Sequence, residues 1–122
     1  MDIEKKTILF VDDMPCILMI LENYFEPKNW NVVLATNSQE AISIINSVPV
    51  DVIVVDFVLK KDSELSGVQL LEYLHSKKYK MLLIGMTGYA AKNKPVWLEK
   101  TFIKPFDSSD LIKYINAKIK LF

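Results

Sequence analysis

Short apolar runs recur at intervals along the chain, and a longer stretch of mixed apolar and polar residues follows each one. Three of the five runs are continuous and not alternating, which is typical of strands that are buried on both faces of a sheet. The pattern therefore predicts a parallel sheet with helices on both faces. The expected strands are residues 7–11, 31–35, 50–55, 81–86 and 101–103.

Four amphipathic segments lie between or after these runs, and their apolar residues recur with the period of a helix. The first covers residues 15–25 and is expected to end at Glu26 and Pro27, because proline cannot continue a helix. Asn37 and Glu40 have the spacing of a capping box at the start of the second helix. The third and fourth helices are expected around residues 68–74 and 111–119, the last one beginning at Asp107 or Ser108.

The crossover between the fourth and fifth strands, residues 87–100, differs from the others. It contains Asn93 and Pro95 and shows little helical periodicity. We therefore expect a helix in this crossover to be shortened or irregular. With 122 residues, the chain is large enough for one hydrophobic core and too small for two, so residues 1–122 are expected to form one domain.

Composition narrows the possible partners and location. Lys and Arg number 15, as do Asp and Glu, so no net charge favours nucleic acid or an anionic membrane. The single cysteine, Cys16, excludes an internal disulfide and is typical of a reducing compartment. No apolar segment has the length of a membrane span or the pattern of a signal peptide. We expect a cytoplasmic protein without nucleic-acid or membrane partners.

Polar residues follow four of the five predicted strands. Asp12 and Asp13 come directly after the first, Asp56 ends the third, Thr87 follows the fourth, and Lys104 follows the fifth. Parallel strands of a doubly wound sheet leave it at the same edge, where ligands of such folds bind. The topology therefore predicts that residues far apart in sequence meet at one rim.

Three carboxylates at one rim repel each other unless a cation compensates them. At ~4 Å two like charges repel by about 1 kcal/mol in water and by about 4 kcal/mol at an effective dielectric constant of 20. Oxygen ligands of this kind suit Mg²⁺, which commonly binds phosphate oxygens as well. Lys104 and the Thr87 hydroxyl suit a phosphoryl group, and a carboxylate can itself accept one. Alternatively, Asp12 and Asp13 only cap the first helix.

The set Asp12–Asp13, Asp56, Thr87 and Lys104–Pro105–Phe106 resembles the receiver domain of two-component response regulators, of the single-domain chemotaxis-regulator type. The resemblance covers essentially the whole chain. It implies a flavodoxin-like α/β fold, a doubly wound five-stranded parallel sheet in the order 2-1-3-4-5. It also implies that Asp56 accepts a phosphoryl group from a sensor histidine kinase or a phosphotransfer protein.

The resemblance assigns a role to each residue of the set. Thr87 would bind a phosphoryl oxygen, and Lys104 would pair with Asp56 before phosphorylation and with phosphate afterwards. The Lys104–Pro105 bond would be cis. The chain would be no enzyme beyond its own phosphorylation and dephosphorylation. The implied Mg²⁺ ligands are Asp12, Asp13, Asp56 and the backbone carbonyl of Val58.

The loop after Asp56 departs from the family pattern. Lys60 stands where proline is common, and Gly67 follows Asp56 by eleven residues, where about eight is usual. The loop is longer and more charged, so unusual partner contacts are expected. Val58 and Tyr89, two residues after Asp56 and Thr87, are bulky and do not activate water, which predicts slow loss of the phosphoryl group.

The fifth predicted strand, on the side where receivers pass on their signal, also departs from the family pattern. Thr101 stands where the family commonly has an aromatic residue that turns inward as the signal is read. Phe102 follows, but neighbouring side chains of a strand point to opposite faces, so Phe102 is not expected to replace it. Two other readings stay open. One is an interaction module that does not depend on phosphorylation. The other is a phosphatase of the haloacid dehalogenase type, although Phe57 and Val58 follow Asp56 where that family needs a second aspartate.

Overall fold

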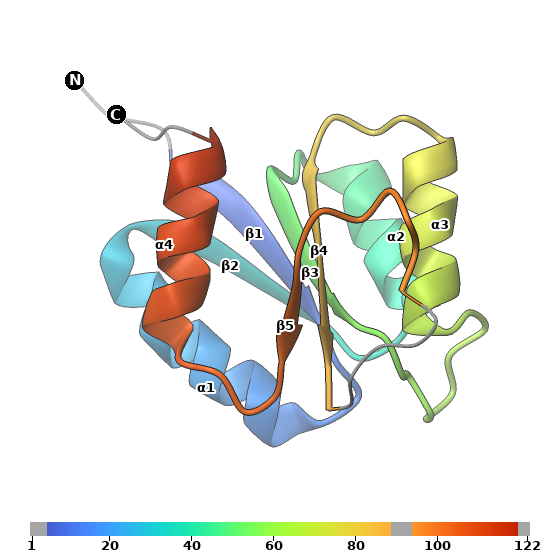
Figure 1. Cartoon of the computed structure of the whole chain (residues 1–122), viewed down its shortest axis with the longest axis horizontal. Helices are drawn as coiled ribbons and strands as arrows, with labels where there is room; N and C mark the ends of the chain where they lie inside the picture. Colours follow the sequence, from blue (N-terminus) through green and yellow to red (C-terminus); the bar gives the residue numbers. More distant parts are fainter. Residues whose placement is uncertain (1–4, 89–93, 120–122) are drawn as a thin grey trace.

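The computed structural model describes residues 5–88 and 94–119, and it contains one parallel sheet in the order β2-β1-β3-β4-β5 (Figure 1). Every neighbouring pair of strands is parallel. The predicted fold class and strand order are therefore confirmed. The strands are β1 (Lys6–Val11), β2 (Trp30–Ala35), β3 (Val52–Asp56), β4 (Leu82–Thr87) and β5 (Thr101–Ile103).

Helices cover both faces of the sheet, as expected. Helices α1 and α4 lie on one face, and α2 and α3 lie on the other (Figure 1). None of the helices formed by the described residues is long and apolar enough to cross a membrane. The helices are α1 (Pro15–Phe25), a 3₁₀ turn η1 (Glu26–Lys28), α2 (Ser38–Ser47), α3 (Gly67–Ser76) and α4 (Ser108–Ile119).

The start of α2 shows how local sequence sets a boundary, and it corrects one prediction. The Asn37 side chain accepts a hydrogen bond from the Glu40 backbone N–H (2.8 Å), as a cap should. The Glu40 carboxylate, however, accepts from the backbone N–H and hydroxyl of Thr36 (2.7 and 3.0 Å) and not from Asn37. The expected capping box is thus only half right. A complete one opens α3, formed by Ser66 and Gln69.

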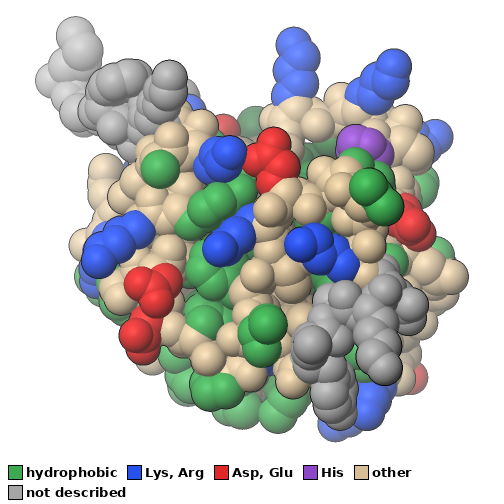
Figure 2. Space-filling model, viewed as in Figure 1, with side chains coloured by type: hydrophobic (Ala, Val, Ile, Leu, Met, Phe, Trp, Pro, Cys, Tyr) green, Lys and Arg blue, Asp and Glu red, His purple; other side chains and the backbone are tan. Residues whose placement is uncertain are grey.

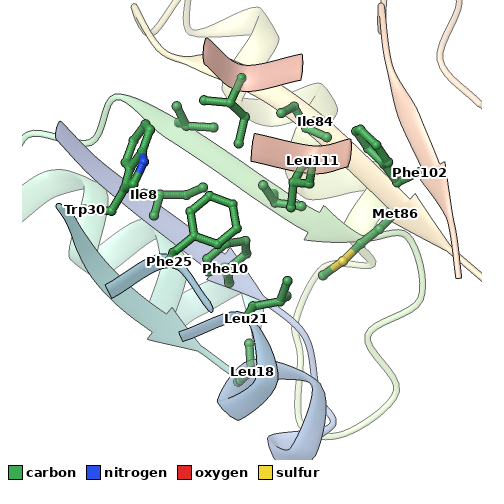
Figure 3. Close-up of a cluster of buried hydrophobic side chains, with 13 residues drawn as sticks. Ile8, Phe10, Leu18, Leu21, Phe25, Trp30, Ile84, Met86, Phe102 and Leu111 are labelled. Atoms are coloured by element: carbon green, nitrogen blue, oxygen red, sulfur yellow. The ribbon is translucent and has the colours of Figure 1, made fainter. Parts of the chain in front are cut away.

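The hydrophobic core consists of two clusters, one on each face of the sheet. The cluster beneath α1 and α4 includes Phe10, Phe25 and Leu111 (Figure 3). The cluster beneath α2 and α3 includes Leu70 and Leu74. All five residues of β3 are buried, which agrees with the continuous apolar run that predicted burial on both faces. The sheet is therefore a rigid base for the residues that follow its strands.

The crossover from β4 to β5 has no helix among its described residues, 94–100, while residues 89–93 lie outside the described part. Leu98 is buried in the cluster beneath α2 and α3. The Trp97 ring stacks on the exposed His75 of α3, with centroids 3.9 Å apart and planes 2° apart. The described half of the crossover thus lies against α3 (Figure 1) and makes a turn in which the Leu98 N–H donates to the Pro95 carbonyl (3.1 Å). This agrees with the expected shortened or irregular helix.

The surface between β5 and α4 combines apolar and cationic side chains. Apolar side chains gather between β5 and α4, with lysines beside them (Figure 2). The Lys100 ammonium group lies 5.1 Å from the Phe102 ring centroid and 5.7 Å from that of Tyr114. Phe102 itself is buried in the cluster beneath α1 and α4. It points away from the face on which Thr101 lies, as the alternation predicted.

Candidate functional site

Lys104 joins the ends of three strands at the carboxyl edge of the sheet. Its Nζ atom lies 2.6 Å from Asp12 Oδ2 and 2.7 Å from Asp56 Oδ2. Asp12 is fully buried and Asp56 is 8% exposed, so these charges are held largely away from water. The predicted convergence of β1, β3 and β5 on one rim is therefore observed. The Lys104–Pro105 bond is cis, as the resemblance implies.

Burial and charge act in opposite directions on this cluster. Burial raises the pKa of the Asp12 carboxyl, and the hydrogen bond from Lys104 only partly offsets the rise. Burial also works to lower the pKa of Lys104, but its hydrogen bonds to Asp12 and Asp56 outweigh that effect and raise it. Lys104 therefore remains a cation at neutral pH and is shared between the two carboxylates.

The alternative interpretation, in which Asp12 and Asp13 only cap the first helix, does not describe their contacts. The residue before the helix is Met14, and no side chain accepts a cap hydrogen bond there. Asp12 Oδ1 accepts from the Met14 backbone N–H (2.9 Å). Asp13 Oδ2 accepts from the backbone N–H groups of Lys60 and Lys61 (2.8 and 3.3 Å). Asp13 thus ties the end of β1 to the loop that follows β3.

The three carboxylates are close enough to hold one metal ion. Asp12, Asp13 and Asp56 each offer an oxygen, and these oxygens all lie within 4.8 Å of one another. A donor set made only of oxygens matches Mg²⁺. Val58 lies beside these carboxylates, and its backbone N–H donates to Asp56 Oδ1 (3.1 Å). The role expected of the Val58 carbonyl stays a prediction.

Thr87 lies where the prediction needs it, at the end of β4 beside Lys104. It is 3% exposed, and its carbonyl accepts from the Lys104 backbone N–H (2.7 Å). Its proposed contact with a phosphoryl group stays a prediction. Tyr89, the second residue invoked for slow dephosphorylation, lies outside the described residues.

A cleft of about 510 Å³ opens onto this cluster. Asp13 and Asp56 border it on one side, and Lys60, Lys61 and Lys104 bring positive charge to it. The size is within the range of small-molecule sites, roughly 300–1,000 Å³. A phosphoryl group together with a metal ion can therefore be accommodated beside Asp56.

The long loop after Asp56 is held by contacts that the sequence did not reveal. Ser38 is 1% exposed. Its hydroxyl accepts from the Leu65 backbone N–H, and its own N–H donates to Ser63 Oγ (both 2.9 Å). The adjacent Gln39 side chain donates to the Asp62 carbonyl (2.6 Å) and accepts from the Glu64 N–H (3.0 Å). The start of α2 therefore fixes the far part of the loop.

Gly67 allows α3 to begin directly beneath Asp56. A Cβ atom at this position would lie 1.6 Å from the Asp56 carbonyl oxygen, and the Gly67 N–H donates to the Phe57 carbonyl (3.0 Å). Only a residue without a side chain permits this approach. The loop is longer than in the usual pattern, yet it returns the chain to the acceptor strand.

Thr101 occupies the position at which the resemblance leads us to expect an aromatic residue. Thr101 pairs with Gly85 across β4 and β5. Its hydroxyl oxygen is buried and has no hydrogen-bond partner among the described residues. Buried polar groups are normally paired, so this one departs from the rule.

The comparisons with known proteins agree with this geometry. Residues 8–116 match the family model described as the response regulator receiver domain. The response regulator GtcR of Aneurinibacillus migulanus is 27% identical over 95% of this chain and 48% of its own length. SaeR of Staphylococcus aureus is 25% identical over 89% of this chain, again with 48% of its own length. The chain thus spans about half the length of these curated relatives.

Solved structures show the same fold. A receiver domain protein described as CheY-like, from Methanospirillum hungatei, superposes with a TM-score of 0.85, at 27% identity, and covers 95% of this chain and 94% of its own. TrrA of Thermotoga maritima, solved in complex with Mg²⁺–BeF, superposes with a TM-score of 0.80, at 23% identity, and covers 92% of this chain and 97% of its own. At that lower identity the second match supports the fold alone.

Proposed function

The chain belongs to the response regulator receiver family, and on that premise we propose that it is a phosphorylation-dependent signalling switch. In this proposal residues 1–122 form one receiver domain, and Asp56 accepts the phosphoryl group. The donor is a phosphohistidine on a sensor kinase or on a phosphotransfer protein. The signal then leaves through a protein contact or through onward transfer of the phosphoryl group.

One observation carries the proposal: Lys104 holds Asp12 and Asp56 together from a third strand at 2.6 and 2.7 Å. A structural ion pair would need only one carboxylate. Two buried carboxylates and one lysine, with Asp13 within reach, leave excess negative charge that costs stability. Such an arrangement is typical of functional sites, where ionisable groups are positioned for chemistry.

Each residue of the site has a different role in the proposed phosphoryl transfer. An Asp56 oxygen attacks phosphorus, the bond from phosphorus to the donor atom breaks, and the donor leaves with the electron pair. Lys104 releases Asp56 and pairs with the new phosphoryl oxygens, while the buried Thr87 hydroxyl donates to another of them. Asp12, Asp13, Asp56 and the Val58 carbonyl would hold Mg²⁺. A bound magnesium ion would neutralise charge on the phosphoryl and carboxylate oxygens.

Intact-mass spectrometry tests the proposal directly. The protein is incubated with acetyl phosphate, with and without Mg²⁺, beside the Asp56→Asn variant. We expect a gain of one phosphoryl group that requires magnesium and is absent in the variant. Asp51→Asn is a suitable control, because Asp51 lies at the opposite edge of the sheet, where its carboxylate accepts from the Thr7 N–H.

Absence of any mass gain in the wild type would contradict the proposal. It would favour the second candidate, an interaction module that does not depend on phosphorylation, for which Thr101 at the position of the usual aromatic residue is the supporting observation. A phosphatase of the haloacid dehalogenase type is disfavoured. The residue two beyond Asp56 is Val58, which carries no carboxylate, so turnover of a phosphate monoester is not expected.

A further inference from the structure

The loop between β3 and α3 places two lysines at the mouth of the cleft that contains Asp56. Lys60 and Lys61 both border this cleft, and both are exposed. Their backbone N–H groups donate to the same oxygen of Asp13, at 2.8 and 3.3 Å. The acidic site itself therefore fixes where these two lysines stand.

The remainder of the loop is fixed independently at the start of α2. Ser38 and Gln39 bind Ser63, Leu65 and the backbone of the residues between them. The loop thus has one anchor on each side of Lys60 and Lys61. Its position relative to the cleft is set by hydrogen bonds and does not depend on the lysine side chains.

The two ammonium groups are not used within the described structure. The ion pairs among residues 5–88 and 94–119 involve Lys104 and Lys118, and neither Lys60 nor Lys61 takes part in one. Together with Lys104 they oppose the three carboxylates of the site. The cleft therefore does not repel an approaching phosphate, which a cluster of carboxylates alone would do.

We propose that Lys60 and Lys61 recruit the phosphoryl donor by charge, so that a donor whose phosphoryl group is a dianion is favoured over one whose phosphoryl group carries a single negative charge. This inference rests on the proposed function. A lysine is a mobile point charge with three donors, suited to a phosphate that is not yet bound in one orientation. Two such charges attract a dianion about twice as strongly as a monoanion at the same distance.

The lysines take no part in the bonds that change. With acetyl phosphate as the donor, an Asp56 oxygen attacks phosphorus, the bond from phosphorus to the acyl oxygen breaks, and acetate leaves with the electron pair. Lys60 and Lys61 raise the concentration of the donor at the cleft before this step. They are recruiting residues, and their effect must weaken as salt screens their charge.

The test compares initial rates of Asp56 phosphorylation in the full chain, followed by intact mass, with acetyl phosphate and with phosphoramidate. Near neutral pH the first is a dianion and the second carries one negative charge fewer. In the double variant Lys60→Gln with Lys61→Gln, we expect the rate with acetyl phosphate to fall by about three- to tenfold at low ionic strength. The fall should be smaller with phosphoramidate and should shrink at about 0.15 M salt.

Two further variants separate charge from structure. Lys77→Gln with Lys78→Gln removes the same charge from the exposed end of α3, at the opposite edge of the sheet, and should keep the wild-type rate. Lys60→Arg with Lys61→Arg keeps the charge and should restore both the rate and its dependence on salt.

Three outcomes would overturn the inference. They are an unchanged rate in the glutamine variant, an equal loss with both donors, and an equal loss in the control at the end of α3. If the wild type is phosphorylated and one of these is seen, the inference fails alone. If the wild type takes up no phosphoryl group from either donor, the proposed function fails with it.

Discussion

In the described part of the chain, buried polar groups are paired at the ends of β1 and β3, but one on β5 is not. At the end of β1 and β3 the buried carboxylates of Asp12 and Asp56 share the Lys104 ammonium group. Two strands away, at β5, the buried hydroxyl of Thr101 has no partner among the described residues. The first region is the proposed site of phosphoryl transfer. In the second, threonine stands where the resemblance leads us to expect an aromatic residue, and its hydroxyl is buried without compensation from the described residues.

The comparison leads us to expect that the proposed phosphoryl-transfer site and the β5 side can be altered independently of each other. The residues of the proposed site are positioned by strand ends and by the close backbone approach at Gly67, while on the β5 side the buried Thr101 hydroxyl has no partner among the described residues. Four substitutions test this difference.

Gly67→Ala should have the largest effect on stability, because Gly67 packs directly against the backbone of Asp56 and Phe57. The added Cβ would lie 1.6 Å from the Asp56 carbonyl oxygen and 2.8 Å from the Phe57 Cα. Backbone atoms cannot rotate out of the way, so α3 must shift. We expect a loss of about 3 kcal/mol or more in the free energy of unfolding, measured by urea denaturation.

The matched control is Gly88→Ala, at the exit of β4. A Cβ there meets no atom of residues 5–88 and 94–119 within 4 Å, so the change should stay within about 0.5 kcal/mol. If the two alanine variants unfolded at the same urea concentration, the acidic region would not be more tightly constrained than the exit of β4.

Lys104→Met comes second, because it leaves two buried carboxylates without their cation. Removing one partner of a buried ion pair costs about 3–5 kcal/mol, and the partial exposure of Lys104 (19%) places this loss nearer 2 kcal/mol. Without Lys104 the pKa of Asp12, already raised by burial, should rise further. A folded-state pKa above the unfolded value means that the native state binds more protons, so stability increases as pH falls.

The deficit of Lys104→Met should therefore be full at about pH 7 and shrink as the pH falls toward the ordinary range of carboxyl groups, at about pH 4. Urea denaturation at both values measures it. The exposed Lys113→Met should show neither the loss nor the dependence on pH. A deficit that grew on acidification would mean that the carboxylates were not the groups left unpaired.

Asp12→Asn tests the same charge excess from the acidic side. Burial raises the pKa of Asp12, so the ionised form is disfavoured in the folded state. The amide keeps an acceptor for the Met14 N–H and removes one negative charge, but it gives up the hydrogen bond from Lys104, which keeps Asp56 as its partner. We expect stabilisation by about 1 kcal/mol at neutral pH in the absence of divalent cations, and loss of the stability gained from Mg²⁺. Destabilisation at neutral pH would mean that the pairing with Lys104 outweighs the cost of burial.

Much of the fold and the centre of the site could be predicted from the sequence, for one physical reason. Buried parallel strands are continuous apolar runs in the sequence. Because these strands all end at the same edge of the sheet, Asp12, Asp56 and Lys104 come together independently of the loop conformations. The strand at residues 101–103 and the helix at Pro15–Phe25 have the expected bounds. These features depend on periodicity and topology alone.

What could not be predicted depends on the path of a loop in space. The contact of Asp13 with the Lys60 and Lys61 backbone and the anchoring by Ser38 join residues more than twenty positions apart. No periodicity encodes such contacts. The eleven-residue offset of Gly67 looked like a departure, although it preserves the close approach to Asp56. Glu40 was assigned the wrong cap partner because Thr36 offers two donors beside it.

Thr101→Val is the smallest change and bears most directly on the β5 side. Valine has the shape of threonine without the hydroxyl, so the substitution removes a buried group that has no partner among the described residues. A buried unpaired hydroxyl costs about 1–3 kcal/mol relative to a paired one. We expect Thr101→Val to raise the free energy of unfolding by about 0.5–1 kcal/mol, measured by urea denaturation, with phosphorylation of Asp56 unchanged.

Thr36→Val is the matched control, since the Thr36 hydroxyl donates to Glu40 (3.0 Å), and there valine should stabilise nothing. If Thr101→Val instead lowered stability, the Thr101 hydroxyl would have a partner in solution, such as a buried water. The two regions would then obey the same rule. A gain in stability without a loss of phosphorylation would mean that the β5 side can be altered independently of the chemistry, which is the separation that the comparison implies.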